Sequence, residues 1–584
     1  MKEPPAPING IAPDAAIWAL VALAGVMAVG WAGASLAAIA ASGTGLGVST
    51  HEVGEALMRL PSHRLDPALA WPPDVAARLP GPWLYWSCQL AVLAATTALA
   101  VVVLRWRKGQ ASRSALGVRL NTGLGAGRDL RRLVVRGPAA GRVVVGRAGR
   151  RLVATEAQAS LAVVGPSGCG KTAGLAIPTL LEWEGPVLAT SVKADLVENT
   201  LGHRAGRGRV WVFDPTGASG ARPAPWSPLG PAQTWAGALR VATWLTDAAQ
   251  PRRRSSLSDA DYWYSQARKG LAPYLHAAAL AGLDMAQVVR WVDTADHTEV
   301  AAILDELAAS GEGDQPDGVA GSASVVGQLF GDEAMVAAEA LWRKEDRLRC
   351  SIFATMENVV APYADPVVGG AAPGEGIDLD EWLAGDNTIY VVAAAHDQAR
   401  LRPVLSVLVA EAARRAFDTA NAAGGALAHP CLLLLDEAGN IAPLTELPTY
   451  AATARAHNIA LLTVWQDLAQ LNALYGEAAS TVLNNHRAKL FGSGIADTPT
   501  LDYLSGLVGD ERRVEHNTSM DLAGGRRSVS EHTTYRRAAP PDALRRLRSN
   551  EALLVYGSEV PVRVRLRPWF ADRRLHALAT RVGY

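Results

Sequence analysis

The fold expected for this 584-residue chain is decided by the stretch Gly165-Pro166-Ser167-Gly168-Cys169-Gly170-Lys171-Thr172. Glycines at these spacings let backbone N–H groups wrap around phosphates, the lysine reaches the β and γ oxygens, and the threonine hydroxyl binds Mg²⁺. An apolar run of strand length precedes the loop at 160–164, and residues 172–183 after it have a helical pattern. Strand, loop and helix together predict a site for ATP and Mg²⁺.

The second half of such a site is expected at a buried strand that ends in a carboxylate. Residues 431–435 are all apolar and are followed directly by Asp436 and Glu437. A run of this kind is typical of a central parallel strand, and ligands bind at the carboxyl ends of such strands. We therefore predict that Asp436 acts on the Mg²⁺ and Glu437 on the attacking water. The alternative is an apolar strand followed by two solvated acids.

Two further residues flank a third apolar strand, predicted at 459–465. Gln466 ends this strand where it would approach the γ-phosphate, so it is a candidate sensor, although a turn or helix-capping glutamine is the alternative. Arg455 precedes the strand and is a candidate arginine finger for a neighbouring subunit's phosphate. A surface salt bridge explains Arg455 equally well.

Composition and hydropathy predict a membrane anchor. Hydrophobic residues make up 49% of the chain and charged residues 19%, and the four cysteines have no paired spacing that would indicate zinc or disulfides. Uncharged runs at about 15–41 and 82–104 are long enough to cross a bilayer. A cleaved signal peptide is the alternative for the first run, but it lacks a basic start.

The distribution of basic residues predicts the orientation of this anchor. Thirteen Arg or Lys and one acid lie between Arg105 and Arg151, whereas the loop 42–81 has three arginines. By the positive-inside rule both termini are cytoplasmic, in a multi-pass protein of the cytoplasmic membrane. The net charge is zero, so a polyanionic partner would have to meet a local basic surface.

The spacing of the two halves of the site predicts an insertion. Asp436 lies 265 residues after Lys171, far more than two adjacent strands require. Residues 226–385 are rich in helix-forming residues at helical spacing, and a strand pattern resumes at 387–392. We expect a membrane anchor over 1–110, a nucleotide-binding domain over 111–225 and 386–584, and an inserted all-α domain over 226–385.

Several motifs together resemble the TraG/TraD coupling proteins of type IV secretion and conjugation. They are GPSGCGKT (165–172), LLLLDEAGN (432–440), ARAHNIALLTVWQDLAQL (454–471), and weaker matches from Val187 to the tail motif 552–557. The sequence departs from this family's usual Asp-Pro-Lys-Gly-Glu-Leu at 191–196, where Ser191 replaces the first aspartate and Lys193 and Asp195 remain. The role of that aspartate therefore cannot be assigned to this chain.

The resemblance implies an α/β, RecA-like P-loop NTPase domain with an all-α insertion behind two transmembrane helices. It also implies a homo-hexameric ring at the inner face of the membrane, in contact with membrane lipid. The ring would use ATP to drive single-stranded DNA or a relaxase–DNA complex into a type IV secretion channel. It supports Gln466 as the γ-phosphate sensor. Two other functions stay open: a double-stranded DNA pump of the chromosome-segregation type, and a non-hydrolysing receptor for secretion substrates.

Overall fold

The computed structural model describes residues 13–111, 124–125, 129–250, 258–310, 333–370, 376–520 and 527–580. The chain divides into two compact units, residues 1–120 and 121–584, which are described in turn. The finer domain boundaries expected at 110, 225 and 385 stay predictions.

The first unit is helical and contains both predicted spans. Its helices are α1 (Pro13–Ser42), α2 (Thr50–Arg59), α3 (Pro73–Ala76) and α4 (Pro82–Ala111). The segments Ala22–Ser42 and Pro82–Val103 are long and apolar enough to cross a membrane, by length and composition alone. The segment between them, with Val53 and Trp71 among its buried residues, packs against α1 and α4 to form a small core of this unit.

Small residues allow α1 and α4 to lie close together. A Cβ on Gly33 would come within 2.3 Å of the Gln89 side-chain oxygen, and Gln89 Nε2 donates a hydrogen bond to the Gly30 carbonyl at 3.0 Å. Small residues and buried amides are the usual means of joining apolar helices where no water drives their association. The two helices therefore pack as a hairpin in this unit.

A single large sheet organises the second unit. Its strand order is β1-β3-β2-β14-β13-β10-β4-β9-β8-β5-β7-β6. The pairings from β10 to β6 are parallel, and those from β1 to β10 are antiparallel. The strands are β1 (Val134–Val135), β2 (Val144–Ala148), β3 (Arg151–Ala154), β4 (Leu161–Val164), β5 (Val187–Ser191), β6 (Val210–Phe213), β7 (Thr388–Val392), β8 (Cys431–Leu435), β9 (Ile459–Trp465), β10 (Ala488–Gly492), β13 (Glu551–Tyr556) and β14 (Val562–Arg565).

Helices cover both faces of this sheet, which explains why its central strands are continuously apolar. Alternate residues of β8 belong to different cores: Leu433 to one face and Leu434 to the other. The helices outside the insertion are α5 (Ile177–Glu182), α6 (Asp195–Glu198), α7 (Leu201–Ala205), α16 (Gln398–Ala422), α17 (Ala438–Ile441), α18 (Leu447–Thr453), α19 (Leu468–Tyr475), α20 (Ala478–Asn485), α21 (Thr498–Val508), α22 (Pro541–Arg545) and α23 (Arg573–Ala579).

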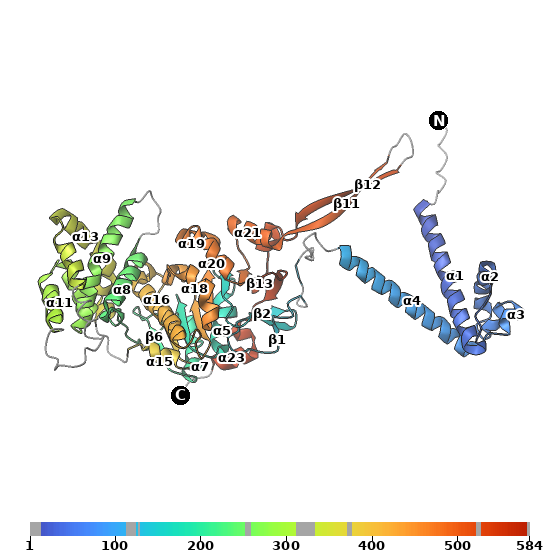
Figure 1. Ribbon diagram of the computed structural model, residues 1–584, viewed down its shortest axis with the longest axis horizontal. Helices are drawn as coiled ribbons and strands as arrows, with labels where there is room; N and C mark the ends of the chain where they lie inside the picture. Colours follow the sequence, from blue (N-terminus) through green and yellow to red (C-terminus); the bar gives the residue numbers. More distant parts are fainter. Residues whose placement is uncertain are drawn as a thin grey trace, which may run out of the picture. The chain divides into compact units, whose positions relative to one another are not determined.

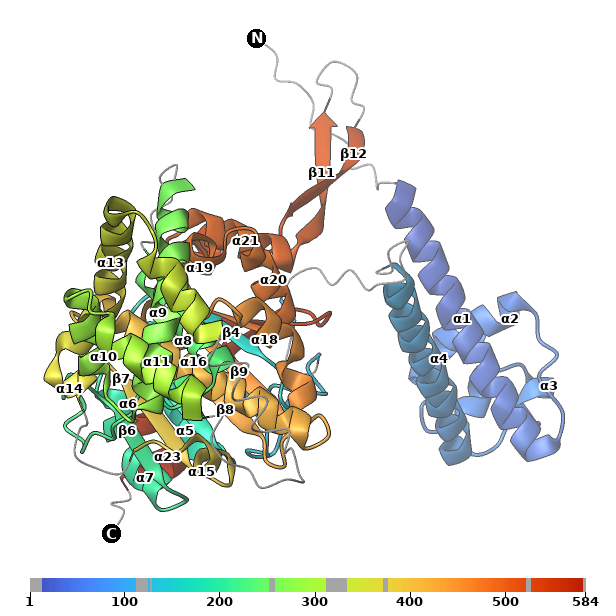
Figure 2. The ribbon, with the colours of Figure 1, turned by 60° about the vertical axis from the view of Figure 1, so that its left-hand side comes forward.

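Within the described residues, the segment between β6 and β7 consists of helices joined by turns and loops, and it contains no strand. Its helices are α8 (Trp235–Ala249), α9 (Ser258–Leu280), α10 (Met285–Asp293), α11 (Thr298–Ser310), α13 (Asp346–Val360), α14 (Pro366–Gly369) and α15 (Leu379–Leu383). Helices α8, α9, α11 and α13 gather at one end of the second unit (Figures 1 and 2). The predicted helical insertion is therefore present between two strands that pair directly with each other in parallel.

The chain after β10 returns to the phosphate-loop helix. That helix begins with a π turn, Thr172–Ala176, and continues as α5. Pro178 has no N–H to donate to the Gly174 carbonyl, and the Arg567 N–H donates to that carbonyl instead, at 3.2 Å. The Arg567 guanidinium also makes a bidentate ion pair with Glu182, and both side chains are 5% exposed.

A separate two-stranded ribbon follows α21. It consists of β11 (Asp510–Met520) and β12 (Arg527–Arg537), paired antiparallel over their whole length. The ribbon projects from the second unit beside α21 (Figures 1 and 2). In the sequence, the ribbon lies between the parallel strand β10 and the antiparallel strands β13 and β14.

Candidate nucleotide site

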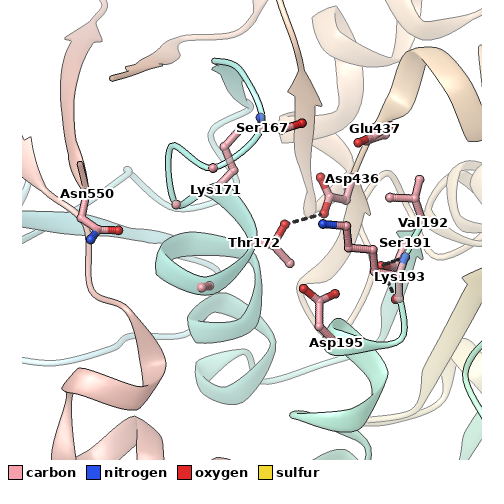
Figure 3. Close-up of a pocket in the computed structure, with 13 residues that line it drawn as sticks. Ser167, Lys171, Thr172, Ser191, Val192, Lys193, Asp195, Asp436, Glu437 and Asn550 are labelled. Carbon is pink, nitrogen blue, oxygen red and sulfur yellow. Dashed lines mark hydrogen bonds between the residues drawn. The ribbon is translucent and has the colours of Figure 1, made fainter. Parts of the chain in front are cut away.

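The predicted phosphate loop connects β4 to the π turn that opens the following helix (Figure 3). Gly168 and Gly170 have φ values of +84° and +93°, a region that favours glycine. The Gly165 N–H donates to the Trp465 carbonyl at 3.1 Å, which places the start of the loop beside the end of β9. The loop therefore has the backbone conformations that the sequence pattern requires.

Cys169 has a packing role in this loop. Its side chain is 3% exposed, and its sulfur would lie within 2.9 Å of a Cβ built on either Gly165 or Gly492. Burial raises the pKa of the Cys169 thiol, so the reactive thiolate is disfavoured. The thiol fills the space left by two glycines.

The loop's lysine and threonine point in different directions. Lys171 Nζ donates to the carbonyls of Gly165 and, at 2.9 Å, Pro166. Thr172 Oγ1 donates to Asp436 Oδ2 at 3.1 Å, across 264 residues of sequence. The two predicted halves of the site are therefore in direct contact.

Asp436 and Glu437 follow β8, as predicted, and Figure 3 shows them side by side. Asp436 is 5% exposed, and its carbonyl accepts a hydrogen bond from Thr190 at 2.8 Å. Burial raises the pKa of the Asp436 carboxyl to about 6, although the Thr172 hydrogen bond acts in the opposite direction. Glu437 has a left-handed backbone, φ +53° and ψ +48°, and is half-buried.

A pocket of about 320 Å³ lies between these groups. Of the predicted site residues it is lined by Ser167, Gly168, Gly170, Lys171, Thr172, Asp436 and Glu437. Gln466 and Arg455 are described but do not line it. Gln466 directly follows Trp465, whose carbonyl accepts from the loop, whereas Arg455 lies before β9 and forms an ion pair with Glu156 at 3.3 Å.

Besides Ser191, the pocket is lined by three polar residues to which the sequence assigned no role. Lys193 and Asp195 belong to the segment that departs from the family's motif. The Ser191 hydroxyl donates to the Lys193 carbonyl at 2.8 Å and accepts from its N–H at 3.3 Å, so it shapes the turn that carries Lys193. Figure 3 shows the Lys193 ammonium directed toward Asp436.

Asn550 is the third of these residues and comes from the chain just before β13. It has a φ of +62°, and its side-chain oxygen would lie 2.5 Å from a Cβ on Gly170. Figure 3 places it on the opposite side of the loop's helix from Asp195. In the sequence, Asn550 is an asparagine at a turn ahead of an apolar strand. Asparagines are common at such turns, so the sequence does not indicate that this one lines a site.

The oxygen atoms of this pocket suit a hard divalent cation. Thr172 and Asp436 offer a hydroxyl and a carboxylate in contact, and one carboxylate oxygen of Asp195 is buried without a hydrogen-bond partner. Mg²⁺ prefers oxygen ligands and keeps several waters when it binds with phosphates. Within the described residues no cluster of three or more His, Cys, Asp or Glu side chains could hold a metal by itself, so phosphate and water would have to complete the shell.

The fold and this loop define a P-loop NTPase-type α/β domain with a helical insertion. The sequence model of the family described as "Type IV secretory system Conjugative DNA transfer" matches residues 133–582. The chain belongs to this family, and the resemblance to TraG/TraD-type coupling proteins is confirmed.

Individual relatives agree with this assignment. The conjugal transfer protein TraG of Escherichia coli is 25% identical over 381 residues, which are 62% of this chain and 56% of TraG. The plasmid coupling protein TrwB, solved with the ATP analogue ADPNP, superimposes with a TM-score of 0.55 at 17% identity, over 77% of this chain and 94% of TrwB. TrwB solved with ADP and Mg²⁺ superimposes with a TM-score of 0.51 at 17% identity, over 76% of this chain and 93% of TrwB. The predicted fold class is confirmed. The chain spans little more than half of the length of TraG.

We predict that burial of Asp436 destabilises the folded protein at neutral pH when divalent cations are absent. Its folded pKa of about 6 lies above its ordinary value of 3.8, so the folded state binds this proton more tightly than the unfolded state. Raising the pH from about 4 to about 6 therefore lowers the free energy of unfolding, by about 2–3 kcal/mol in total, and the loss stays constant above that range.

Asp436→Asn removes this titration and should raise the thermal midpoint by a few degrees at pH 8. The difference from the unsubstituted protein should shrink as the pH falls toward 4. Thermal unfolding of the full chain in detergent with a chelator would measure it. Equal midpoints at pH 8 would contradict the predicted cost of burying this carboxylate.

Proposed function

We propose that this chain is a membrane-anchored ATPase that drives DNA into a type IV secretion channel during conjugation. The observation that carries the proposal is the contact between Thr172 and the buried Asp436 in the pocket beneath the phosphate loop. This contact joins a nucleotide-binding loop to the carboxylates needed for hydrolysis. Membership of the conjugative DNA transfer family supports DNA as the cargo.

ATP and Mg²⁺ are the proposed ligands of the pocket, in line with the ATP-analogue and ADP–Mg²⁺ complexes of TrwB. The loop 165–172 would wrap the phosphates with its backbone N–H groups, and Lys171 would leave its two carbonyl partners to meet the β and γ oxygens. Thr172 and Asp436 would hold the Mg²⁺, which neutralises charge on the phosphates. Glu437 would take a proton from the attacking water.

The two apolar helices are the proposed anchor. Large apolar side chains of α4 such as Leu90 and Leu99 are 66% and 63% exposed, as expected for a helix that faces lipid. The excess of arginine and lysine after the second span favours a cytoplasmic location for the second unit and both termini. Part of that basic run, 112–123 and 126–128, lies outside the described residues.

We predict that Glu437→Gln keeps ATP binding and lowers hydrolysis roughly 100-fold or more, because the amide cannot accept a proton. Steady-state hydrolysis and equilibrium ATP binding of the purified full chain would be measured. Glu477→Gln, which alters an exposed carboxylate, is the matched control and should leave both unchanged. Conjugative transfer that survives Glu437→Gln in cells would favour the non-hydrolysing receptor.

Arg455 is proposed to act on a neighbouring subunit of a homo-hexamer. It precedes the seven-residue strand β9, whereas the phosphate loop adjoins the other end, roughly 20 Å away at ~3.3 Å per residue. Its side chain is 51% exposed. Arg455 is therefore too far from its own loop and accessible to a partner.

We predict that Arg455→Ala and Glu437→Gln chains, each inactive alone, regain hydrolysis when mixed. In a mixed ring, a Glu437→Gln subunit supplies its arginine to an intact pocket of an Arg455→Ala neighbour. Arg487→Ala removes another arginine that pairs with Glu156, and this control should stay active. An inactive mixture that nevertheless forms mixed rings would contradict action between subunits.

Single-stranded DNA, free or bound to a relaxase, is the proposed cargo. We predict that hydrolysis by the full chain rises several-fold with single-stranded DNA and less with a duplex of equal length. Electrophoretic binding to the same two DNAs is the companion measurement. A strong duplex preference in both assays would favour the double-stranded DNA pump instead.

A further inference from the structure

Three hydrogen bonds connect Glu437 to the end of β9. Asn440 Nδ2 donates to Glu437 Oε2 at 2.8 Å. Gln470 Nε2 donates to Asn440 Oδ1 at 3.2 Å. The backbone N–H of Gln466 donates to Gln470 Oε1 at 3.2 Å. These hydrogen bonds thus run from Gln466, beside the phosphate loop, to Glu437, the proposed base for the attacking water.

The groups at the two ends fix the direction of every bond in this chain. A backbone N–H can only donate, so Gln470 must turn its oxygen toward Gln466 and its NH₂ toward Asn440. An ionised carboxylate can only accept, so Asn440 must turn its NH₂ toward Glu437. Both amide orientations follow from the ends of the network, and a carboxylate at position 470 could not take the place of the amide.

The surrounding packing is built for this contact. A Cβ on Gly439 would come within 2.7 Å of the Gln470 side-chain amide, so a larger residue at position 439 would displace this amide. A second tie lies farther along α19, where the Tyr475 hydroxyl donates to the Leu444 carbonyl at 2.9 Å. The segment after β8 and helix α19 are therefore held together at two points.

Glu437 itself needs such a restraint. Its backbone is left-handed, a conformation that glutamate rarely adopts, and its side chain is only half-buried at the pocket wall. The Asn440 amide holds one carboxylate oxygen, which leaves the other to receive a proton. Without that bond, rotation about the side-chain torsions would move the carboxylate relative to the water.

We propose that Asn440 and Gln470 are positioning residues that fix the Glu437 carboxylate and couple its position to the Gln466 end of β9. A nucleotide that shifts Gln466 would shift Glu437 through these two amides. This inference rests on the proposed ATPase function, because it assigns Asn440 and Gln470 to the same hydrolysis step. It adds two residues that act through Glu437 and do not touch the nucleotide.

The alternative is that Gln470 only stabilises the start of α19, and the experiment must distinguish this role from positioning of Glu437. Gln470 is the third residue of α19, a position where glutamine or glutamate often accepts from a backbone N–H ahead of the helix. Gln470→Glu would keep this capping bond but could not donate to Asn440. The substitution therefore separates the relay from the cap.

The test measures ATP hydrolysis and ATP affinity of the full chain for Asn440→Ala and Gln470→Glu. We expect both to lower kcat roughly 10- to 100-fold, as a small displacement of a catalytic group does, with unchanged ATP affinity and thermal midpoint. Each substitution should have no further effect in a Glu437→Gln background, because both act through Glu437. The double variant should be no slower than the slower single variant.

The outcomes distinguish this inference from the proposed function. Gln470→Glu with unchanged kcat would overturn the relay and leave the ATPase intact. Additive losses in the Glu437→Gln background would also overturn it, since the amides would then act independently of Glu437. An unsubstituted chain without ATPase activity would overturn the proposed function and the relay together.

Discussion

The hydrogen bond from Thr172 to Asp436 is the contact on which the rest of the site depends. It joins the first turn after the phosphate loop to the end of a strand 264 residues later. Asp436 is 5% exposed, and burial raises the pKa of its carboxyl to about 6. A buried carboxylate of this kind weakens the fold when it is ionised, and a bound cation would offset that cost. The ionised Asp436 carboxylate therefore favours cation binding at the cost of the stability of the protein without a ligand.

The central parallel strands make this contact possible because they bring distant segments to one edge. Strand β4 lies beside β9, and β9 beside β8, so the loop after β4 and the acids after β8 are separated by a single strand. The residue that follows the intervening strand is Gln466. Its backbone N–H starts the amide chain to Glu437, so the same strand order accounts for both the pocket and the proposed relay.

The C-terminal part of the sheet supports the loop from the other side. Leu566 packs so closely on Gly174 that a Cβ there would lie 2.9 Å from it, and Arg567 pairs with Glu182 where both side chains are nearly buried. Removing one member of a buried pair leaves an uncompensated charge, which typically costs about 3–5 kcal/mol. The phosphate-loop helix is thus fixed by residues almost 400 positions later in the chain, and Asn550 enters the pocket from the same segment.

The sequence by itself determined the phosphate loop, the acids after β8, the apolar helices and the helical insertion, since each depends on a local pattern of glycine, charge or hydrophobic spacing. The family resemblance also followed from these motifs. Only the tertiary structure decided which distant side chains share the pocket. Lys193 and Asp195 were visible as a motif without a role, and Asn550 was not foreseen, because a turn asparagine carries no sign of what it faces. Likewise, the contact of Asn440 with Gln470 depends on the packing of α17 against α19, and no spacing within either helix encodes it.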